Sequence, residues 1–390
     1  MANEVTDARQ RPLIAYPDGA DSARVAPRAA ARLAGFAEVE LDVLLGWTPE
    51  DRPWLASDAL RGTTVMAGYA LASAVRDGRL RYVPTRLSVV PQLVAQAAPD
   101  VAVVTGVRRG TRLAYRGTVG WGPAATRAAR RVVVEVDAGT PDLGAPLIEG
   151  DVVAVVERQG GATAAAPRAC DDVDLAIGRR VAALLPDDAT IQLGPGGIAE
   201  AIVAGIERPV RVFSGLLTES TAVLAQRGLL AGTAVAGYVW GDDAIVDLAR
   251  AGRLRLEPVE TTHDVSGVGA IERFVACNTA LQVGLDGAVN VERVGTRVVA
   301  GIGGHADFCA AASRSRGGMS VIALRSTDRR GNSTIVPRVD VVSTPRCDVD
   351  LVVTEHGVAD LRDRTDDERA ARMVAVAAPQ HRAGLARSST

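Results

Sequence analysis

Apolar residues fall in short continuous runs, and these runs alternate with stretches of helical periodicity. Val101–Val104, Arg131–Val136 and Val152–Val156 are runs of this kind. Such runs are typical of strands that are covered on both faces. Residues 171–185 repeat apolar positions with a helical period, and a further apolar run follows at Thr190–Leu193. This alternation predicts an α/β fold built on mainly parallel sheets.

The chain of 390 residues is long enough for two domains of about 150 residues each. Gln159–Pro167 consists mostly of small residues with almost no charge, which indicates a linker. We therefore expect domains at residues 1–165 and 166–390. A similar order of strand, turn, strand, glycine turn, alanine-rich helix and strand occurs near residues 100–136 and again near 274–323, which suggests that one domain is duplicated.

Composition and charge exclude several classes of protein. Hydrophobic residues make up 47% of the chain, so a sizeable core is expected, and aromatic residues make up only 3%. The net charge of −2 gives no basic surface for nucleic acid. No apolar run approaches the ~20 residues of a membrane span, and the first residues resemble no signal peptide, so we expect a cytoplasmic protein. The four cysteines lack metal-binding spacing, which predicts reduced, buried thiols and no metal.

A glycine-rich turn at Gly194, Gly196 and Gly197 follows the strand at Thr190–Leu193 and opens a helix. Glycines let the backbone approach a ligand, and a helix N-terminus offers free N–H groups to an anion. The spacing is not that of a dinucleotide site. A tight turn without a ligand explains the same pattern equally well.

A second glycine turn comprises Gly301, Ile302, Gly303 and Gly304 and is followed by His305. Closely spaced glycines can form a nest of N–H donors around a carbonyl or carboxylate oxygen, with His305 at its rim. The alternative is a structural turn in which Asp307 caps the following helix.

Two polar stretches near the C-terminus also carry groups that can bind or react. The hydroxyls of Ser326 and Thr327 could bind an anion or a pantetheine group, although ordinary turn chemistry explains them too. Glu355 and His356 could form an acid–base pair. Adjacent residues on a strand point to opposite faces, so a direct pair is not expected there.

The order and spacing of these blocks resemble the acetyl-CoA hydrolase/transferase family, which includes 4-hydroxybutyrate, butyrate and acetate CoA-transferases. Residues 275–324 and 343–385 carry the resemblance, and Ile191–Ile198 matches the family's first glycine turn. The resemblance implies two α/β domains of the CoA-transferase (NagB/RpiA-like) type with the active site between them, and a homodimer. It also implies coenzyme A as a substrate thioester, with Gly301–Gly304 contacting the acyl group.

The chain departs from the family pattern at the nucleophile. In the transferases a glutamate that follows a strand attacks the thioester and forms a glutamyl anhydride. A gapless match places Gly215 at that position. A local shift of four residues, about one helical turn, would instead offer Glu219 as the nucleophile. The other explanation accepts the loss of the nucleophile, and Glu260, His305 or Glu355 then activates a water.

These observations leave several functions open. The first is CoA transfer or acyl-CoA hydrolysis. The alternatives are a divergent member that performs another thioester, C–C hydrolytic or biosynthetic tailoring step without the glutamate, and a catalytically silent CoA-binding protein.

Overall fold

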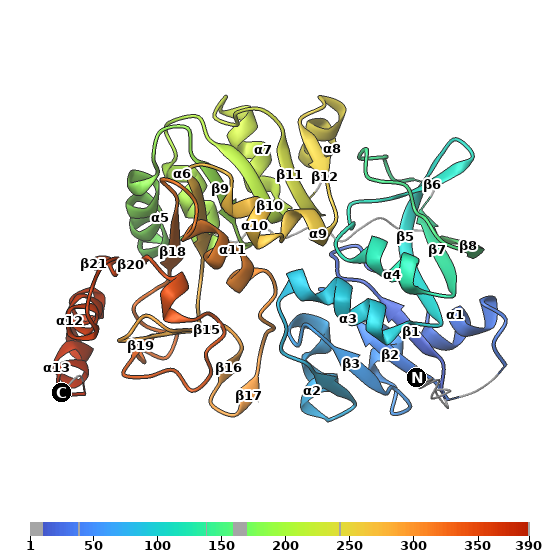
Figure 1. The fold of residues 1–390 in the computed structure, drawn as a ribbon, viewed down its shortest axis with the longest axis horizontal. Helices are drawn as coiled ribbons and strands as arrows, with labels where there is room; N and C mark the ends of the chain where they lie inside the picture. Colours follow the sequence, from blue (N-terminus) through green and yellow to red (C-terminus); the bar gives the residue numbers. More distant parts are fainter. Residues whose placement is uncertain (1–10, 38–39, 138, 159–169, 242, 389–390) are drawn as a thin grey trace, which may run out of the picture.

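The computed structural model describes residues 11–37, 40–137, 139–158, 170–241 and 243–388. These residues form two α/β domains that lie side by side, the N-terminal domain in blue to green and the C-terminal domain in green to red (Figure 1). The predicted fold class is confirmed. The expected linker and the boundary near residue 166 lie outside the described residues.

The N-terminal domain is built on one sheet with strand order β4-β3-β2-β1-β5-β7-β8, in which β6 pairs with β5. All neighbours on the main path are parallel, and β6 is antiparallel to β5. The strands are β1 (Leu13–Tyr16), β2 (Asp42–Leu45), β3 (Gly62–Thr64), β4 (Leu80–Tyr82), β5 (Val101–Arg109), β6 (Arg112–Tyr115), β7 (Arg131–Asp137) and β8 (Val152–Arg158). The α-helices are α1 (Pro27–Leu33), α2 (Ala72–Arg76), α3 (Val90–Ala97) and α4 (Gly122–Ala128), and the 3-10 helices are η1 (Pro53–Ala56), η2 (Tyr69–Leu71) and η3 (Leu87–Val89).

The C-terminal domain has a sheet of order β12-β11-β10-β9-β13-β18-β20-β21, parallel except for the last pair. Its strands are β9 (Thr190–Leu193), β10 (Arg211–Thr218), β11 (Ala234–Trp240), β12 (Leu254–Leu256), β13 (Phe274–Asn278), β18 (Met319–Ala323), β20 (Leu351–Thr354) and β21 (Gly357–Asp360). The helices are α5 (Asp172–Leu184), α6 (Gly197–Gly205), α7 (Glu219–Gln226), α8 (Asp243–Arg250), α9 (Val259–Thr262), α10 (Val265–Gly269), α11 (His305–Ala312), η4 (Arg346–Asp348), α12 (Asp366–Val376) and α13 (Pro379–Arg387). Two small sheets pair β15 (Val289–Asn290), β14 (Gln282–Gly284) and β19 (Ile335–Val336), and β16 (Arg293–Val294) with β17 (Arg297–Val298).

The two large sheets repeat one topology. In each, the first strand of the domain lies centrally, the next three follow in order on one side, and the remaining strands follow on the other. The pair β5 and β7 therefore corresponds to β13 and β18, which are the strands that flank the alanine-rich helices α4 and α11. The topology agrees with the duplication that the sequence suggests.

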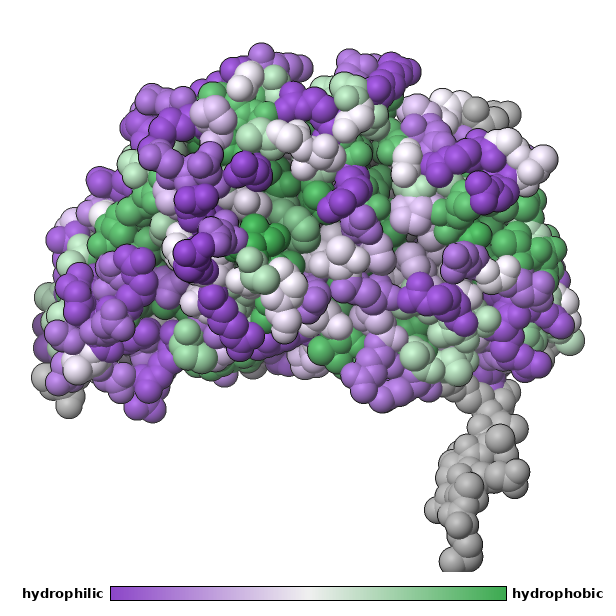
Figure 2. Space-filling view, turned by 45° about the horizontal axis from the view of Figure 1, so that its top comes forward, coloured by the Kyte–Doolittle hydropathy of each residue, from purple (hydrophilic) through white to green (hydrophobic). Residues whose placement is uncertain are grey.

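Two expectations about burial are wrong. Val153 and Val155 of β8 are 40% and 39% exposed, because β8 is an edge strand and every second side chain along it faces outward. Figure 2 shows apolar surface on the side of the molecule where the N-terminal domain lies. The four cysteines are free thiols, but Cys347 is exposed because it lies in the surface helix η4. No helix in the described part of the chain is both long and apolar enough to cross a membrane.

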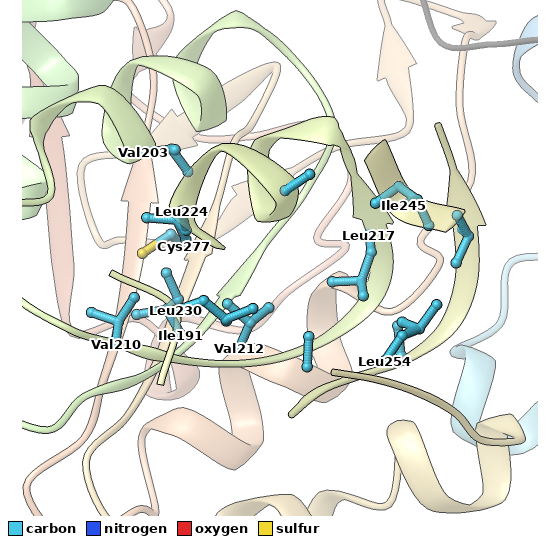
Figure 3. Packing of buried hydrophobic residues seen from close by; sticks show 14 of the residues in the cluster. Ile191, Val203, Val210, Val212, Leu217, Leu224, Leu230, Ile245, Leu254 and Cys277 are labelled. Atoms are coloured by element: carbon cyan, nitrogen blue, oxygen red, sulfur yellow. The ribbon is translucent and has the colours of Figure 1, made fainter. Parts of the chain in front are cut away.

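Strand β10 changes face along its length. Val212 and Leu217 are five residues apart, yet both belong to one buried cluster, which Figure 3 shows together with Leu224 of α7. In a regular strand an odd separation places two side chains on opposite faces. Gly215 lies between them, and Gly215 and Gly237 are missing from the otherwise continuous pairing of β10 with β11. The alternation of buried and partly exposed side chains along β10 therefore shifts by one residue at Gly215.

Candidate functional site

A cavity of about 700 Å³ opens at the carboxyl ends of β9, β13 and β18. Ligands of parallel α/β sheets bind at this edge, and the volume suits a small-molecule site. Among the residues that the structure describes, every lining residue lies between Asp171 and Glu355, in the C-terminal domain. The lining brings together residues that the sequence singled out at separate places: Gly194, Gly196, Gly197, Thr327 and Glu355.

The first glycine turn has the predicted form of a strand, a turn and a helix. β9 ends at Leu193 and α6 begins at Gly197. Gly196 has a φ of 131°, which favours glycine, and a Cβ on Gly194 or Gly196 would meet nothing within 4 Å. Because packing does not demand glycine at position 194, the open backbone faces a space that a ligand can enter. The free N–H groups at the start of α6 lie at the same wall.

Charged side chains also line the cavity. Arg325 makes two hydrogen bonds to the Asp174 carboxylate, at 3.0 and 2.7 Å, and a salt bridge of 2.8 Å to Asp171. These bonds raise the pKa of Arg325. Asp171 also accepts the N–H groups of Val173 and Asp174 and so caps α5. The guanidinium is therefore held at the cavity by the first turn of α5.

Ser326 does not line the cavity but positions a residue that does. Its buried hydroxyl donates to Glu355 at 2.5 Å, and its N–H donates to the same carboxylate at 3.0 Å. The expectation that Glu355 and His356 point apart is wrong, because both lie in the two-residue turn between β20 and β21. His356 Nε2 lies 3.6 Å from Glu355 Oε1.

The second glycine turn, Gly301–Gly304, docks on the N-terminal domain. Leu87 N–H donates to Gly303 O at 3.1 Å, and Gly303 has a φ of 58°. A Cβ on Gly301 would lie 2.7 Å from Met66 Sδ, so only glycine permits this approach. The turn thus lies at the junction of the domains, beside the cavity rather than in its lining. Its contact with an acyl group stays a prediction.

His305 connects the turn to the cavity. Its Nδ1 lies 2.8 Å from Thr344 Oγ1 and its Nε2 lies 3.2 Å from the carbonyl of Thr279, which lines the cavity. Burial lowers the pKa of His305 to about 4, so the ring is neutral at pH 7. Both ring nitrogens are already bonded, which favours a positioning role over a role as a base.

Asp307 does not cap α11, contrary to the alternative that the sequence allowed, because the N-cap position is Gly304. Its carboxylate instead crosses the domain junction. It accepts the hydroxyl of Ser88 at 2.6 Å and the N–H of Ser88 at 3.1 Å. Burial raises the pKa of Asp307 to about 6. The pairing clamps α11, and the turn before it, to the N-terminal domain.

Gly215 lies next to the cavity, and the space in front of it is occupied. Ser214 Oγ of β10 donates to Leu193 O of the neighbouring strand β9 at 2.9 Å. Gly215 and Gly194, the next residue of each segment, therefore lie on adjacent segments. A Cβ on Gly215 would lie 3.0 Å from His263 Nε2 and 3.2 Å from Phe308. A Cβ on Gly304 would lie 2.4 Å from the same nitrogen. The buried imidazole of His263 therefore separates β10 from the second glycine turn.

The three candidate catalytic side chains lie at three separate places. Glu219 does not lie one helical turn from Gly215, contrary to the expectation, because β10 continues to Thr218 and four extended residues span about 13 Å. Glu219 begins α7, and its Cγ lies 3.5 Å from the Cβ position of Gly241. Glu260 forms an ion pair with Arg127 across the domain junction. His305 bonds to the threonines described above.

His263 is the site residue that the sequence interpretation missed. It is one of only four histidines, and it lies in the same segment as Glu260. Its position against Gly215 depends on a contact between residues 48 apart, which periodicity does not reveal. Within the described ranges, no group of three or more His, Cys, Asp or Glu side chains is arranged to hold a metal ion.

Comparison with known proteins gives a consistent result for both domains. Residues 17–158 match the model of the acetyl-CoA hydrolase/transferase N-terminal domain, and residues 244–389 match that of the C-terminal domain. The 4-hydroxybutyrate coenzyme A transferase of Clostridium kluyveri is 29% identical over 352 residues, which cover 83% of this chain and 81% of that protein. The acetyl-CoA hydrolase of Kluyveromyces lactis is 24% identical over 393 residues, covering 84% and 74%.

Solved structures share the whole fold. RipA of Yersinia pestis superposes with a TM-score of 0.84 at 24% identity, covering 97% of this chain and 93% of that chain. A 4-hydroxybutyrate CoA-transferase of Porphyromonas gingivalis superposes with a TM-score of 0.75 at 24% identity, covering 97% and 92%. The same two-domain architecture thus recurs in both.

Proposed function

Because the chain belongs to the acetyl-CoA hydrolase/transferase family, we propose that it is an enzyme that hydrolyses an acyl-CoA thioester. Relatives named for both reactions, CoA transfer and acetyl-CoA hydrolysis, match it over most of its length. The cavity at Gly194–Gly197 takes part of the coenzyme, and the turn Gly301–Gly304 lies beside the acyl group. Coenzyme A is the substrate carrier, and the mechanism needs no metal.

We propose hydrolysis rather than CoA transfer because position 215 is a glycine. The family resemblance places the transferase nucleophile at this position, and glycine offers no carboxylate to form an anhydride. The side-chain atoms nearest to its missing Cβ belong to His263 and Phe308. Glu219 lies at the far end of β10, about 13 Å along the strand. Water is then the simplest acceptor for the acyl group.

The remaining functions make different predictions. CoA transfer through Glu219 requires a carboxylic acid acceptor, whereas a silent CoA-binding protein turns over nothing. A C–C hydrolytic or other tailoring step would leave simple thioesters intact.

The family also makes a homodimer and a cytoplasmic location reasonable, and we include both in the proposal.

The experiment supplies acetyl-, butyryl- and succinyl-CoA to the full chain, with and without acetate as acceptor. We expect free thiol and free acid to appear at equal rates, independent of acetate. Transfer is the correct reaction if new acyl-CoA forms only with acetate and no thiol is released. Binding of CoA without any turnover supports the silent protein instead.

A further inference from the structure

A second cavity, of about 300 Å³, lies in the N-terminal domain at the amino ends of its strands. Leu41 and Arg61, which line it, immediately precede the parallel strands β2 and β3. Met66, which follows β3 and approaches Gly301 at the domain junction, lies at the opposite edge of the same sheet. In Figure 1 helix α1, whose first residues line this cavity, lies at the right of the molecule, and helices α5 and α6 of the larger cavity lie at the left. The two cavities are therefore separate.

The lining of this second cavity is positively charged. Among the described residues it contains three arginines, Arg11, Arg28 and Arg61, and one carboxylate, Glu40. Arg11 pairs with Glu40, but the two side chains are 43% and 74% exposed, so water weakens the pair. Neither Arg28 nor Arg61 has a carboxylate partner in the part of the chain that the structure describes. Two positive charges therefore remain uncompensated at the cavity.

The guanidinium of Arg61 is held in place without losing its charge. Its Nη1 donates to the carbonyl of Asp58 at 2.7 Å and to that of Leu60 at 2.9 Å. Its other N–H groups make no hydrogen bond to a described residue. Paired guanidinium N–H groups match the two oxygens of a carboxylate. Arg61 is therefore prepared to bind an anion.

The rest of the lining is largely apolar and includes an indole. Pro27, Leu41, Trp54 and Leu60 contribute to it. The Trp54 ring packs against the buried Tyr16, with ring centroids 5.2 Å apart, and its Nε1 is buried without a partner among the described residues. An inorganic anion would leave this apolar wall unmatched, whereas an organic anion covers it. The volume lies near the lower limit of small-molecule sites, so the ligand must be small.

We propose that this cavity is a second ligand site, which binds a small organic carboxylate. The carboxylate pairs with Arg61 and Arg28, and the apolar part of the ligand packs against Trp54. The site does not depend on the proposed hydrolysis, because it lies at the edge of the sheet that faces away from the domain junction.

The first test titrates the full chain with benzoate, acetate and inorganic phosphate in a calorimeter. We expect benzoate to bind about tenfold more tightly than the other two, because only benzoate buries an apolar ring. Saturating coenzyme A should leave the benzoate affinity unchanged. Phosphate that binds as tightly as benzoate overturns the apolar part of the proposal, and displacement of benzoate by coenzyme A overturns the separate site.

The second test locates the bound benzoate with Arg28→Met and Arg61→Met. Each should weaken benzoate binding about tenfold, because a charged hydrogen bond is lost. Arg112→Met is the matched control, since Arg112 is an exposed arginine of β6 outside the cavity, and it should bind benzoate as wild type does. Circular dichroism checks that all three variants fold, as expected for exposed positions. Unchanged affinity in Arg28→Met and Arg61→Met, or no benzoate binding by wild type, overturns the proposal and leaves the proposed hydrolysis standing.

Discussion

At the scale of single residues, the site depends on three glycines whose missing side chains bring larger groups together. The absence of a side chain at Gly301 lets Met66 of the N-terminal domain approach its backbone. The absence of side chains at Gly304 and Gly215 lets the ring of His263 lie against both. The imidazole fills the volume that a side chain at position 215 would need. A nucleophile and this histidine therefore exclude each other in the present geometry.

Gly304→Ala tests the close approach. The new Cβ would lie 2.4 Å from His263 Nε2, so the ring or the turn must shift. We expect a loss of about 1–3 kcal/mol in the free energy of unfolding and about 100-fold in kcat. Chemical denaturation and steady-state kinetics measure the two effects.

The control is Gly384→Ala in α13, where a Cβ meets nothing within 4 Å and alanine favours a helix. It should keep full activity and unfold no more easily. Equal activity of Gly304→Ala and wild type would contradict the account of this contact.

At the scale of elements, the sequence predicted what local patterns determine. The strand at Thr190–Leu193, its glycine turn and the helix that follows are confirmed, as is the helix that begins at Asp366. The run Val152–Val156 is a strand, but its position at the sheet edge depends on the whole topology, so its exposed face was not predictable.

The candidate site was predictable only in part, for the same reason. Gly194–Gly197 and Thr327 meet at one cavity because parallel strands end at one edge. The role expected for Glu219 relied on a helical turn where β10 in fact remains extended. Contacts such as Gly215 with His263 join distant segments, and no local pattern encodes them.

Helix α5 and the segment after β18 are joined at the cavity wall by Arg325 and Asp174. In Arg325→Met the Asp174 side chain, 8% exposed, loses two charged hydrogen bonds. Since Arg325 itself is 42% exposed, water replaces part of the loss, and we expect about 1–2 kcal/mol of destabilisation. CoA affinity should fall as well, which calorimetry measures.

Arg329→Met is the matched control, because Arg329 lines the same cavity and has no ion pair in the part of the chain that the structure describes. It should lower CoA affinity without lowering stability. Unchanged CoA affinity in both variants would show that the coenzyme binds elsewhere.

At the scale of the whole molecule, buried carboxyls join the two domains. Asp18 of the N-terminal domain accepts the hydroxyl of Tyr238 at 3.2 Å, and Asp307 of the C-terminal domain accepts that of Ser88. Tyr82 donates to the buried Glu292 at 2.7 Å, and at the surface of the junction Arg127 pairs with the exposed Glu260. The position of the second glycine turn beside His263 depends on these contacts.

Because of Asp18, we expect the stability of the folded protein to depend on pH. Burial raises the pKa of Asp18 to about 6, above its ordinary value of 3.8, so the folded protein binds this proton more tightly than the unfolded chain. Its contribution to stability is complete below about pH 4 and is lost as the pH rises through 6. Asp18→Asn should therefore gain, relative to wild type, about 3 kcal/mol between pH 4 and pH 7.

Urea unfolding at both pH values measures this gain, with the exposed Asp58→Asn as a control that should show none. A difference between Asp18→Asn and wild type that stays constant from pH 4 to 7 would contradict the account of the junction.

The central claim is that thioester cleavage proceeds without a carboxylate at position 215. Mass spectrometry of the protein after reaction with a thioester tests this claim most directly. Wild-type protein is mixed with acetyl-CoA, treated with borohydride, digested and analysed by mass spectrometry. We predict acetate and free CoA in solution and no modified glutamate in any peptide. A reduced glutamyl thioester on the peptide that contains Glu219, formed at the rate of turnover, would contradict the account.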